Sequence, residues 1–230
     1  MPLTRLQKYL SQAGICSRRE AEKDILNGFV KINGAVVSKL GVKVEVDKDK
    51  VEYKGMPAVI TKKMLYLALN KPDGYISACK DKRGKTVLDL IKIKERIFPV
   101  GRLDKDSCGL ILFTNDGSIH HRLLHPSFDH EKEYEVTVKK PITNFHLLKM
   151  EKGVVINGVK TREAKTEKIS NNSFSITLKE GRNRQIRRMA DALGYKVVKL
   201  KRIRFANILL NGLQEGSWRY LTKNEIKNLI

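Results

Sequence analysis

The chain opens with apolar residues at helical spacing. Such spacing places side chains on one face of a helix, and a glycine commonly marks the helix end. The pattern therefore predicts an amphipathic helix over residues 3–13. The apolar positions of this pattern are Leu3, Leu6, Leu10 and Ala13, and Gly14 follows them.

A second helix and a hairpin are predicted directly after the first helix. Residues 17–20, Ser-Arg-Arg-Glu, have the spacing of a capping box that opens a helix, and Gly28 ends it. The runs at residues 30–32 and 35–37 flank Asn-Gly at 33–34, the strongest two-residue hairpin signal. Two short helices and a hairpin predict a small domain of its own over residues 1–60.

From residue 61 onward the pattern changes to short apolar runs separated by turns. Turn residues such as Lys-Pro-Asp-Gly at 71–74 close the runs, and helical spacing is rare. We therefore expect a second domain over residues 61–230, with a mainly antiparallel mixed sheet and flanking helices, an α+β fold. The runs cover residues 65–69, 110–114, 134–138, 174–178 and 208–210.

One helix is predicted inside a strongly basic segment. Residues 179–204 hold ten basic and two acidic side chains. Within this segment four apolar residues lie at i, i+3, i+4 and i+7, so one helical face belongs to the core. They are Ile186, Met189, Ala190 and Leu193, and Gly194 follows as the helix end.

The arginines of this helix fall on different faces. At about 100° per residue, Arg184 and Arg188 point away from the core face and are free to meet phosphate. Arg187 lies near the edge of the core face. Most such arginines extend back to solvent, but an inward guanidinium needs a buried anion. Asp104 is the candidate for that anion.

The overall charge points to a polyanionic partner. The 230 residues include 46 Lys and Arg against 25 Asp and Glu, a net charge of +21. A domain this basic favours nucleic acid as its partner, with a generally basic proteome as the alternative. Residues 1–60 hold 11 basic and 7 acidic side chains, so most of the charge belongs to the second domain.

Other classes find no support in the sequence. No apolar stretch approaches the roughly 18 residues of a membrane span. The start of the chain lacks the apolar core of a signal peptide, so we expect a cytoplasmic protein with no membrane partner. Cys16, Cys79 and Cys108 form neither a disulfide framework nor a metal-binding pair. Motifs for metal, nucleotide and serine-hydrolase chemistry are missing from the sequence.

Two arginines stand where helix electrostatics would favour acidic residues. Arg18 and Arg19 fall in the first turn of the second predicted helix, at the positive end of its dipole. An external phosphate held by the helix N-terminus and both guanidiniums explains this placement. Solvated surface charge is the alternative interpretation.

A carboxylate between two cations precedes the run at 110–114. The stretch "GRLDKDS" places Arg102, Asp104, Lys105 and Asp106 against that strand. A carboxylate kept ionised beside Arg102, and beside Arg187 if that side chain turns inward, is ready to act as a nucleophile at neutral pH. A structural ion pair has the same appearance, and the residues alone leave both interpretations open.

The first module resembles a known family. "RLQKYLSQAGICSRREAEKDILNGFVKINGAVV" is similar to the small RNA-binding domain named after the fourth protein of the small ribosomal subunit. The resemblance implies RNA as the partner. It places RNA contacts on the basic residues of this module, among them Arg5, Lys8, Arg18, Arg19 and Lys31.

Four motifs of the larger domain resemble the pseudouridine synthases of the RsuA type. In chain order they are "LNKPDG", "GRLDKDSCGLILFTNDG", "EKEYEVTV" and "EGRNRQIRRMADALGY". The resemblance implies an RNA pseudouridine synthase, which detaches a uracil from its ribose, rotates it and rejoins it through carbon, without a cofactor. Further stretches are similar to the members that act on large-subunit (23S) ribosomal RNA, and we expect a monomer.

The resemblance also implies roles for individual residues. Asp104 corresponds to the family's nucleophile, and Tyr134 to the tyrosine that stacks on the base and helps remove a proton. Arg187 corresponds to the basic partner of the nucleophile. Arg102 would hold RNA around the flipped nucleotide, and the phosphate-facing Arg184 and Arg188 complete the expected site.

Two alternatives remain open. The substrate of the same reaction could be small-subunit ribosomal RNA or transfer RNA. Alternatively, the protein would not be a synthase. It would then be a non-catalytic RNA-binding or ribosome-assembly factor, or an enzyme of different chemistry such as a metal-dependent nuclease.

Overall fold

The computed structural model describes residues 3–60 and 63–229, which form two compact units. The front unit contains the chain up to Leu65 together with Ile93–Ile97 and Asn115–Gly117. The larger unit contains Tyr66–Lys92, Phe98–Thr114 and the chain from Ser118 onward. The predicted division between residues 60 and 61 falls next to residues 61 and 62, which lie outside the described residues.

The front unit combines two helices with short strands. Helix α1 covers Leu6–Gln12 and α2 covers Arg18–Leu26. One small sheet has the order β3-β2-β5-β6, and β1 pairs with β4 in a second. The strands are β1 (Leu3–Arg5), β2 (Val30–Ile32), β3 (Ala35–Val37), β4 (Lys43–Glu45), β5 (Val51–Tyr53) and β6 (Met56–Pro57).

The start of the first helix was predicted wrongly. Leu3–Arg5 is strand β1, which pairs antiparallel with β4 and places Leu3 opposite Glu45. The helix begins at Leu6, whose backbone N–H donates to the carbonyl of Val42 at 2.9 Å. Helical spacing alone does not predict this strand, because Leu3–Arg5 pairs with residues some forty positions later in the chain.

The second helix and the hairpin are confirmed. The hydroxyl of Ser17 accepts from the N–H of Glu20 at 3.1 Å, and the Glu20 carboxylate accepts from the N–H of Ser17. Asn33 and Gly34 both have positive φ, 51° and 84°, as a two-residue turn between β2 and β3 requires. Leu6, Leu10, Ala21, Ile25 and Val30 belong to the buried core of this unit.

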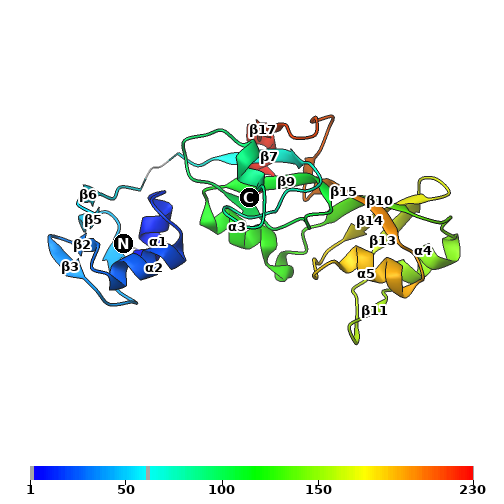
Figure 1. Ribbon diagram of the computed structural model, residues 1–230, viewed down its shortest axis with the longest axis horizontal. Coiled ribbons are helices and arrows are strands. Elements are labelled where there is room, and N and C mark those ends of the chain that lie inside the picture. The colour runs from blue at the N-terminus through cyan, green and yellow to red at the C-terminus, as the bar shows by residue number, and fades with distance from the viewer. Residues whose placement is uncertain (1–2, 61–62, 230) are drawn as a thin grey trace. The chain divides into compact units, whose positions relative to one another are not determined.

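The larger unit is built on one nine-stranded sheet with the main order β13-β14-β10-β15-β9-β7-β17 (Figure 1). Strand β8 also pairs with β9, and β16 with β15. The β15–β9 pair is parallel and the others are antiparallel, so the α+β prediction is confirmed. The strands are β7 (Tyr66–Lys71), β8 (Phe98–Val100), β9 (Cys108–Thr114), β10 (Lys132–Val138), β13 (Lys165–Lys168), β14 (Ser173–Leu178), β15 (Val197–Phe205), β16 (Ile208–Leu209) and β17 (Trp218–Tyr220).

Helices and small elements flank the sheet. Helix α4 packs against β13, and α5 packs against β15 (Figure 1). The helices are α3 (Gly117–Leu124), α4 (Asn144–Glu151), α5 (Gln185–Ala192) and α6 (Lys223–Lys227). The 3-10 turns are η1 (Val87–Leu90) and η2 (Pro126–Phe128), and a separate hairpin joins β11 (Val155–Ile156) to β12 (Val159–Lys160). Across the described ranges no helix is long and apolar enough to cross a membrane.

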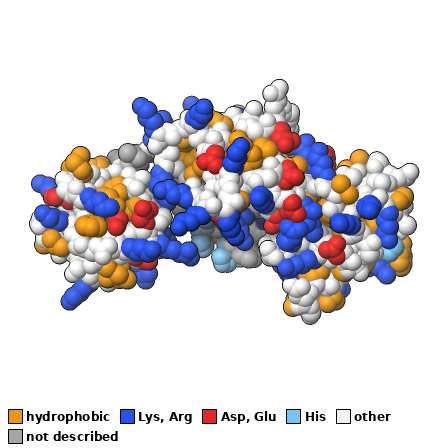
Figure 2. Space-filling view, in the orientation of Figure 1, with side chains coloured by type: hydrophobic (Ala, Val, Ile, Leu, Met, Phe, Trp, Pro, Cys, Tyr) orange, Lys and Arg blue, Asp and Glu red, His pale blue; other side chains and the backbone are white. Residues whose placement is uncertain are grey.

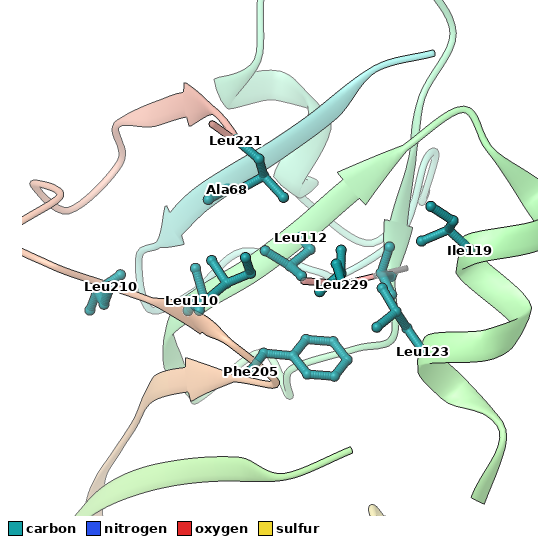
Figure 3. Packing of buried hydrophobic residues seen from close by; sticks show 11 residues of the cluster. Ala68, Leu110, Leu112, Ile119, Leu123, Phe205, Leu210, Leu221 and Leu229 are labelled. Carbon is teal, nitrogen blue, oxygen red and sulfur yellow. The ribbon is translucent and has the colours of Figure 1, made fainter. Parts of the chain in front are cut away.

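The five predicted strand runs lie within or close to observed strands, but β15 was missed. Strand β9 is buried at every position, as its continuous apolar run predicts. Its Leu110 and Leu112 pack with Phe205 of β15 and with Ile119 and Leu123 of α3 (Figure 3). This core fixes the strand end to which the GRLD loop is attached.

Candidate active site

A pocket of about 540 Å³ opens in the larger unit beside the GRLD loop, within the usual size range of ligand pockets. Four of the residues proposed from the sequence line it: Arg102, Asp104, Tyr134 and Arg184. Arg187 and Arg188 are not among the lining residues. The GRLD loop, β10 and the segment before α5 thus meet at one place, although about eighty residues separate the first from the last.

The GRLD loop is held from both sides. It joins β8 to β9, and its Leu103 exchanges two hydrogen bonds with Ser77, whose hydroxyl accepts at 3.1 Å and donates at 2.7 Å. A tight turn follows, in which the N–H of Ser107 donates to the carbonyl of Asp104. At Gly109 a Cβ atom would lie 2.3 Å from the carbonyl oxygen of Arg202, so only glycine permits this close approach of β9 and β15. Asp104 therefore has a fixed backbone position at the pocket.

A fully buried lysine, missed at the sequence level, braces the same loop. Lys71 ends β7, and its Nζ donates to the carbonyls of Ser107 (2.6 Å), Pro72 (3.0 Å) and Lys105 (3.3 Å). Burial lowers the pKa of Lys71 to about 8, a shift that nearby carboxylates such as Asp73 oppose. Lys71 belongs to the motif "NKPDG", which predicts a turn and forms part of the family resemblance but gives the lysine no role.

We expect Lys71 to give the larger unit a distinctive pH dependence. Between the depressed pKa of about 8 and the ordinary value near 10.5, the unfolded chain binds more protons than the folded one. The free energy of unfolding should therefore rise with pH across this window, and the rise should be absent in Lys71→Met. Urea unfolding, followed through the single tryptophan, Trp218 on β17, measures it. Parallel pH curves for both proteins would contradict the prediction.

Two carboxylates and two guanidiniums meet beside the pocket. Arg184 binds Asp106 through two hydrogen bonds of 2.9 and 3.0 Å, and its Nη1 lies 3.8 Å from Oδ2 of Asp104. Arg187 donates to the backbone carbonyl of Asp106 and to the hydroxyl of Ser107, and its Nε lies 3.5 Å from Oδ2 of Asp106. Arg187 is buried, whereas Arg184 is partly open to solvent.

This arrangement corrects the expected pairing of Arg187 with Asp104. The inward turn of Arg187 is present, but its anionic partner is Asp106. In the part of the chain described, the guanidinium within ion-pair distance of Asp104 belongs to Arg184. Arg102 is exposed and lines the pocket without pairing with Asp104.

The backbone at Arg184 explains why this side chain, which was expected to face phosphate, binds Asp106 instead. Arg184 is the residue before α5 and has φ 53° and ψ 33°, the left-handed conformation. The angular arithmetic of a helix therefore does not apply to it, and its side chain turns back to Asp106. Gln185 holds the preceding turn by accepting from the N–H of Arg182 and donating to Glu180. A left-handed arginine is costly and persists where surrounding contacts enforce it.

Electrostatics keep Asp106 charged. The hydrogen bonds from Arg184 and the nearby charge of Arg187 hold the pKa of Asp106 below its ordinary value. Two acids and two arginines balance in charge.

Tyr134 is both a core residue and a pocket residue. Its strand face is buried with Val136 and Val138, so it belongs to the core. The same side chain lines the pocket together with Leu178 and Leu200 from the neighbouring strands. The pocket thus has a carboxylate on one side and an aromatic ring set among apolar side chains on another, which suits a flat, uncharged base.

The other expected RNA-binding residues lie outside the pocket. Arg188 is half-buried and donates to the side chain of Asn183 at 2.8 Å. The exposed ones in the front unit are Arg5, Lys8, Arg18, Arg19 and Lys31. Lys and Arg side chains cover much of the visible face (Figure 2). Within residues 3–60 and 63–229, no group of three or more His, Cys, Asp or Glu could hold a metal ion.

Comparison with known proteins identifies the family to which this chain belongs. The model of the S4 domain matches residues 4–50, and that of the RNA pseudouridylate synthase family matches residues 65–192. The chain is therefore an RNA-modifying enzyme with an S4 RNA-binding domain. It belongs to the RNA pseudouridylate synthase family.

Individual relatives cover nearly the whole chain. The dual-specificity RNA pseudouridine synthase RluF of Salmonella typhi is 45% identical over 98% of this chain and 78% of its own length. The ribosomal large subunit pseudouridine synthase B of Bacillus subtilis (strain 168) is 43% identical, with 99% and 96% covered. A crystal structure of a pseudouridylate synthase matches with a TM-score of 0.73 and 32% identity, covering 98% of this chain and 99% of that one.

Proposed function

We propose that this RNA pseudouridine synthase isomerises a uridine of ribosomal RNA, and specifically of the large subunit. The observation that carries the choice of substrate is the likeness over nearly the whole chain to an enzyme named for the large ribosomal subunit. The protein acts in the cytoplasm as a monomer and needs no cofactor. Residues 1–60 serve as its RNA-binding domain and residues 61–230 as its catalytic domain.

The reaction exchanges one bond of the uridine for another. The bond between C1′ of the ribose and N1 of uracil breaks, and a bond between C1′ and C5 forms. The proton leaves C5, and N1 gains one, so atoms and charge balance. Asp104 acts as the nucleophile that carries the intermediate and is released unchanged. Tyr134 stacks on the flipped base and helps to remove the C5 proton.

Arg187 acts in this proposal through the loop that carries the nucleophile. Its guanidinium holds the carbonyl of Asp106 and the hydroxyl of Ser107, and it also donates to the carbonyl of Val197 at 3.3 Å. Arg184 and Arg102 at the pocket meet the RNA around the flipped nucleotide. Arg188 contacts phosphate further out.

Pseudouridine mapping of ribosomal RNA from cells with and without the protein tests the proposal. One large-subunit uridine should lose its modification when the protein is missing. A loss confined to small-subunit or transfer RNA would overturn the choice of substrate. With the purified protein, RNA carrying tritium at C5 of uridine should release tritium to water, because isomerisation removes that atom.

The front unit gives a separate prediction about affinity. Replacing Arg18 and Arg19 by Ala should weaken RNA binding and lower the slope of log K against log salt by roughly 1.4 to 1.8, the value for two lost phosphate contacts. Turnover at saturating RNA should survive, because Asp104 lies in the other unit. Binding titrations at several salt concentrations measure the slope.

A matched control separates phosphate contact from general charge. Lys48→Ala removes an exposed cation that already pairs with Glu45 at 2.9 Å, so the slope should change much less. Equal slopes for the wild type and the double variant would remove Arg18 and Arg19 from the RNA contact.

A further inference from the structure

A strip of aromatic and basic side chains leads away from helix α3. It consists of His121, Arg122, His125, Phe128 and His130, and we call it the α3 strip. Neighbouring ring centroids lie 5.2 Å (His121 and His125), 6.2 Å (His125 and Phe128) and 6.2 Å (Phe128 and His130) apart. The guanidinium carbon of Arg122 lies 5.7 Å from the centre of the Phe128 ring. The reaction proposed above uses none of these side chains.

The strip is continuous with the pocket through helix α3. Ile119 and Leu123 point into the core, and His120 and Leu124 line the pocket. At about 100° per residue, the face that carries His121 follows directly beyond the pocket face. The backbone of residue 125 continues this turn, because its N–H donates to the carbonyl of His121 at 2.9 Å. An RNA strand that delivers a nucleotide to the pocket therefore passes close to the strip.

The chemistry of the strip suits an unpaired base. Phe128 keeps 47% of its surface exposed, and His121, Arg122 and His125 are exposed as well. The rings of His121 and His125 are tilted by 33°, and His125 meets Phe128 edge-on at 75°, so these pairs are not stacked face to face. Because all three side chains are exposed, parts of their rings are open to a ligand. Exposed rings combined with arginine form the platforms on which proteins stack single-stranded bases. Histidine side chains gather beside Lys and Arg on the visible face (Figure 2).

We propose that the α3 strip stacks an unpaired RNA base adjacent to the uridine that enters the pocket. The proposal rests on the proposed function for the identity of that uridine, but not for the stacking itself. Removing a nucleotide from its stack leaves its neighbour with an exposed face, and Phe128 and its flanking rings offer a replacement. Arg122 contributes a positive charge beside the same strand.

Variants of Phe128 test the strip in the full-length protein. With a fluorescent oligouridine of about twelve nucleotides as the probe, Phe128→Ala should weaken binding about tenfold. Phe128→Leu should weaken it similarly, because leucine retains the apolar contact but has no ring. The slope of log K against log salt should stay unchanged, since no charge is lost. In assays of tritium release from ribosomal RNA transcripts, the same variants should raise KM.

Phe145→Ala is the matched control. Phe145 is exposed, lies beside His146 at 5.5 Å and has Nζ of Lys149 4.5 Å above its ring. It belongs to α4, which contributes none of the described residues that line the pocket. Its loss should change affinity by less than about twofold. Wild-type binding by Phe128→Leu, or an equal loss in Phe145→Ala, would overturn the proposal. A wild-type protein that releases no tritium would instead overturn the proposed function, while the oligouridine measurements still decide the role of the strip.

Discussion

Replacing Asp104 by Asn should abolish pseudouridine formation, with a fall in the single-turnover rate of about 10⁴-fold or more. The amide has the shape of the carboxylate and still fits beside Arg184, but it does not act as a nucleophile at carbon. RNA affinity should change by less than about tenfold, because phosphate contacts elsewhere on the protein supply most of it. Tritium release under single-turnover conditions and filter binding measure the two quantities separately.

The matched control for this variant is Asp129→Asn. Asp129 is an exposed acid of the same unit, pairs with Arg162 at 2.7 Å and has a positive φ of 50°, which asparagine tolerates. Its replacement should leave the rate close to that of the wild type. Comparable turnover by Asp104→Asn would remove Asp104 from the mechanism, and an equal loss in both variants would point to a general effect of charge.

Features encoded by a few neighbouring residues could be predicted from the sequence. The capping box at Ser17 and Glu20 and the turn at Asn33 and Gly34 depend on local geometry, and both form as expected. The buried strand β9 was also recognisable, because a short, continuous apolar run bounded by turn residues is typical of a strand that is buried on both faces.

Strand β15 shows where the hydrophobic pattern fails. Its sequence, VVKLKRIRF, contains four basic side chains, and two irregularities in its pairing with β10 interrupt the alternation of buried and exposed positions. Arg202 is nearly fully buried in this strand and donates to the carbonyl of Leu110 at 2.6 Å. A buried arginine resembles a surface residue in the sequence, so the strand was hidden within a basic segment.

Four of the expected site residues line one pocket, whereas the contacts of the arginines differ from the expected ones. Motifs in the right order brought Asp104 and Tyr134 together, and the structure places both in one pocket. The partners of the arginines depend on two features that a helical spacing does not contain. Arg184 adopts a left-handed backbone, and the carboxylate of Asp106, two positions after Asp104, lies within ion-pair distance of both guanidiniums. Lys71 was missed because its role is to bind backbone carbonyls, which no residue pattern records.

Removal of the Arg187 guanidinium should cost both turnover and stability. In Arg187→Met the apolar stem is preserved, but the carbonyl of Asp106 and the hydroxyl of Ser107 lose their buried donor. The Asp106 carboxylate is itself exposed and stays paired with Arg184, so the loss comes from the buried acceptors that are left without a donor, and we expect a cost of about 1–3 kcal/mol. The loosened loop carries Asp104, so the single-turnover rate should fall about 100-fold.

Two further variants make the result decisive. Arg188→Met removes the neighbouring guanidinium, which is half-buried, does not line the pocket and donates to Asn183 at the pocket edge, so it should weaken RNA binding slightly and leave the rate intact. Arg187→Lys keeps the charge but loses the planar fork, and should recover stability better than turnover, because a lysine does not bind the carbonyl of Asp106 and the hydroxyl of Ser107 with the same geometry. Rates are measured well below the unfolding temperature of each variant, so that partial unfolding does not contribute. If Arg187→Met only loosened RNA and kept the wild-type single-turnover rate, Arg187 would have no part in holding the nucleophile's loop.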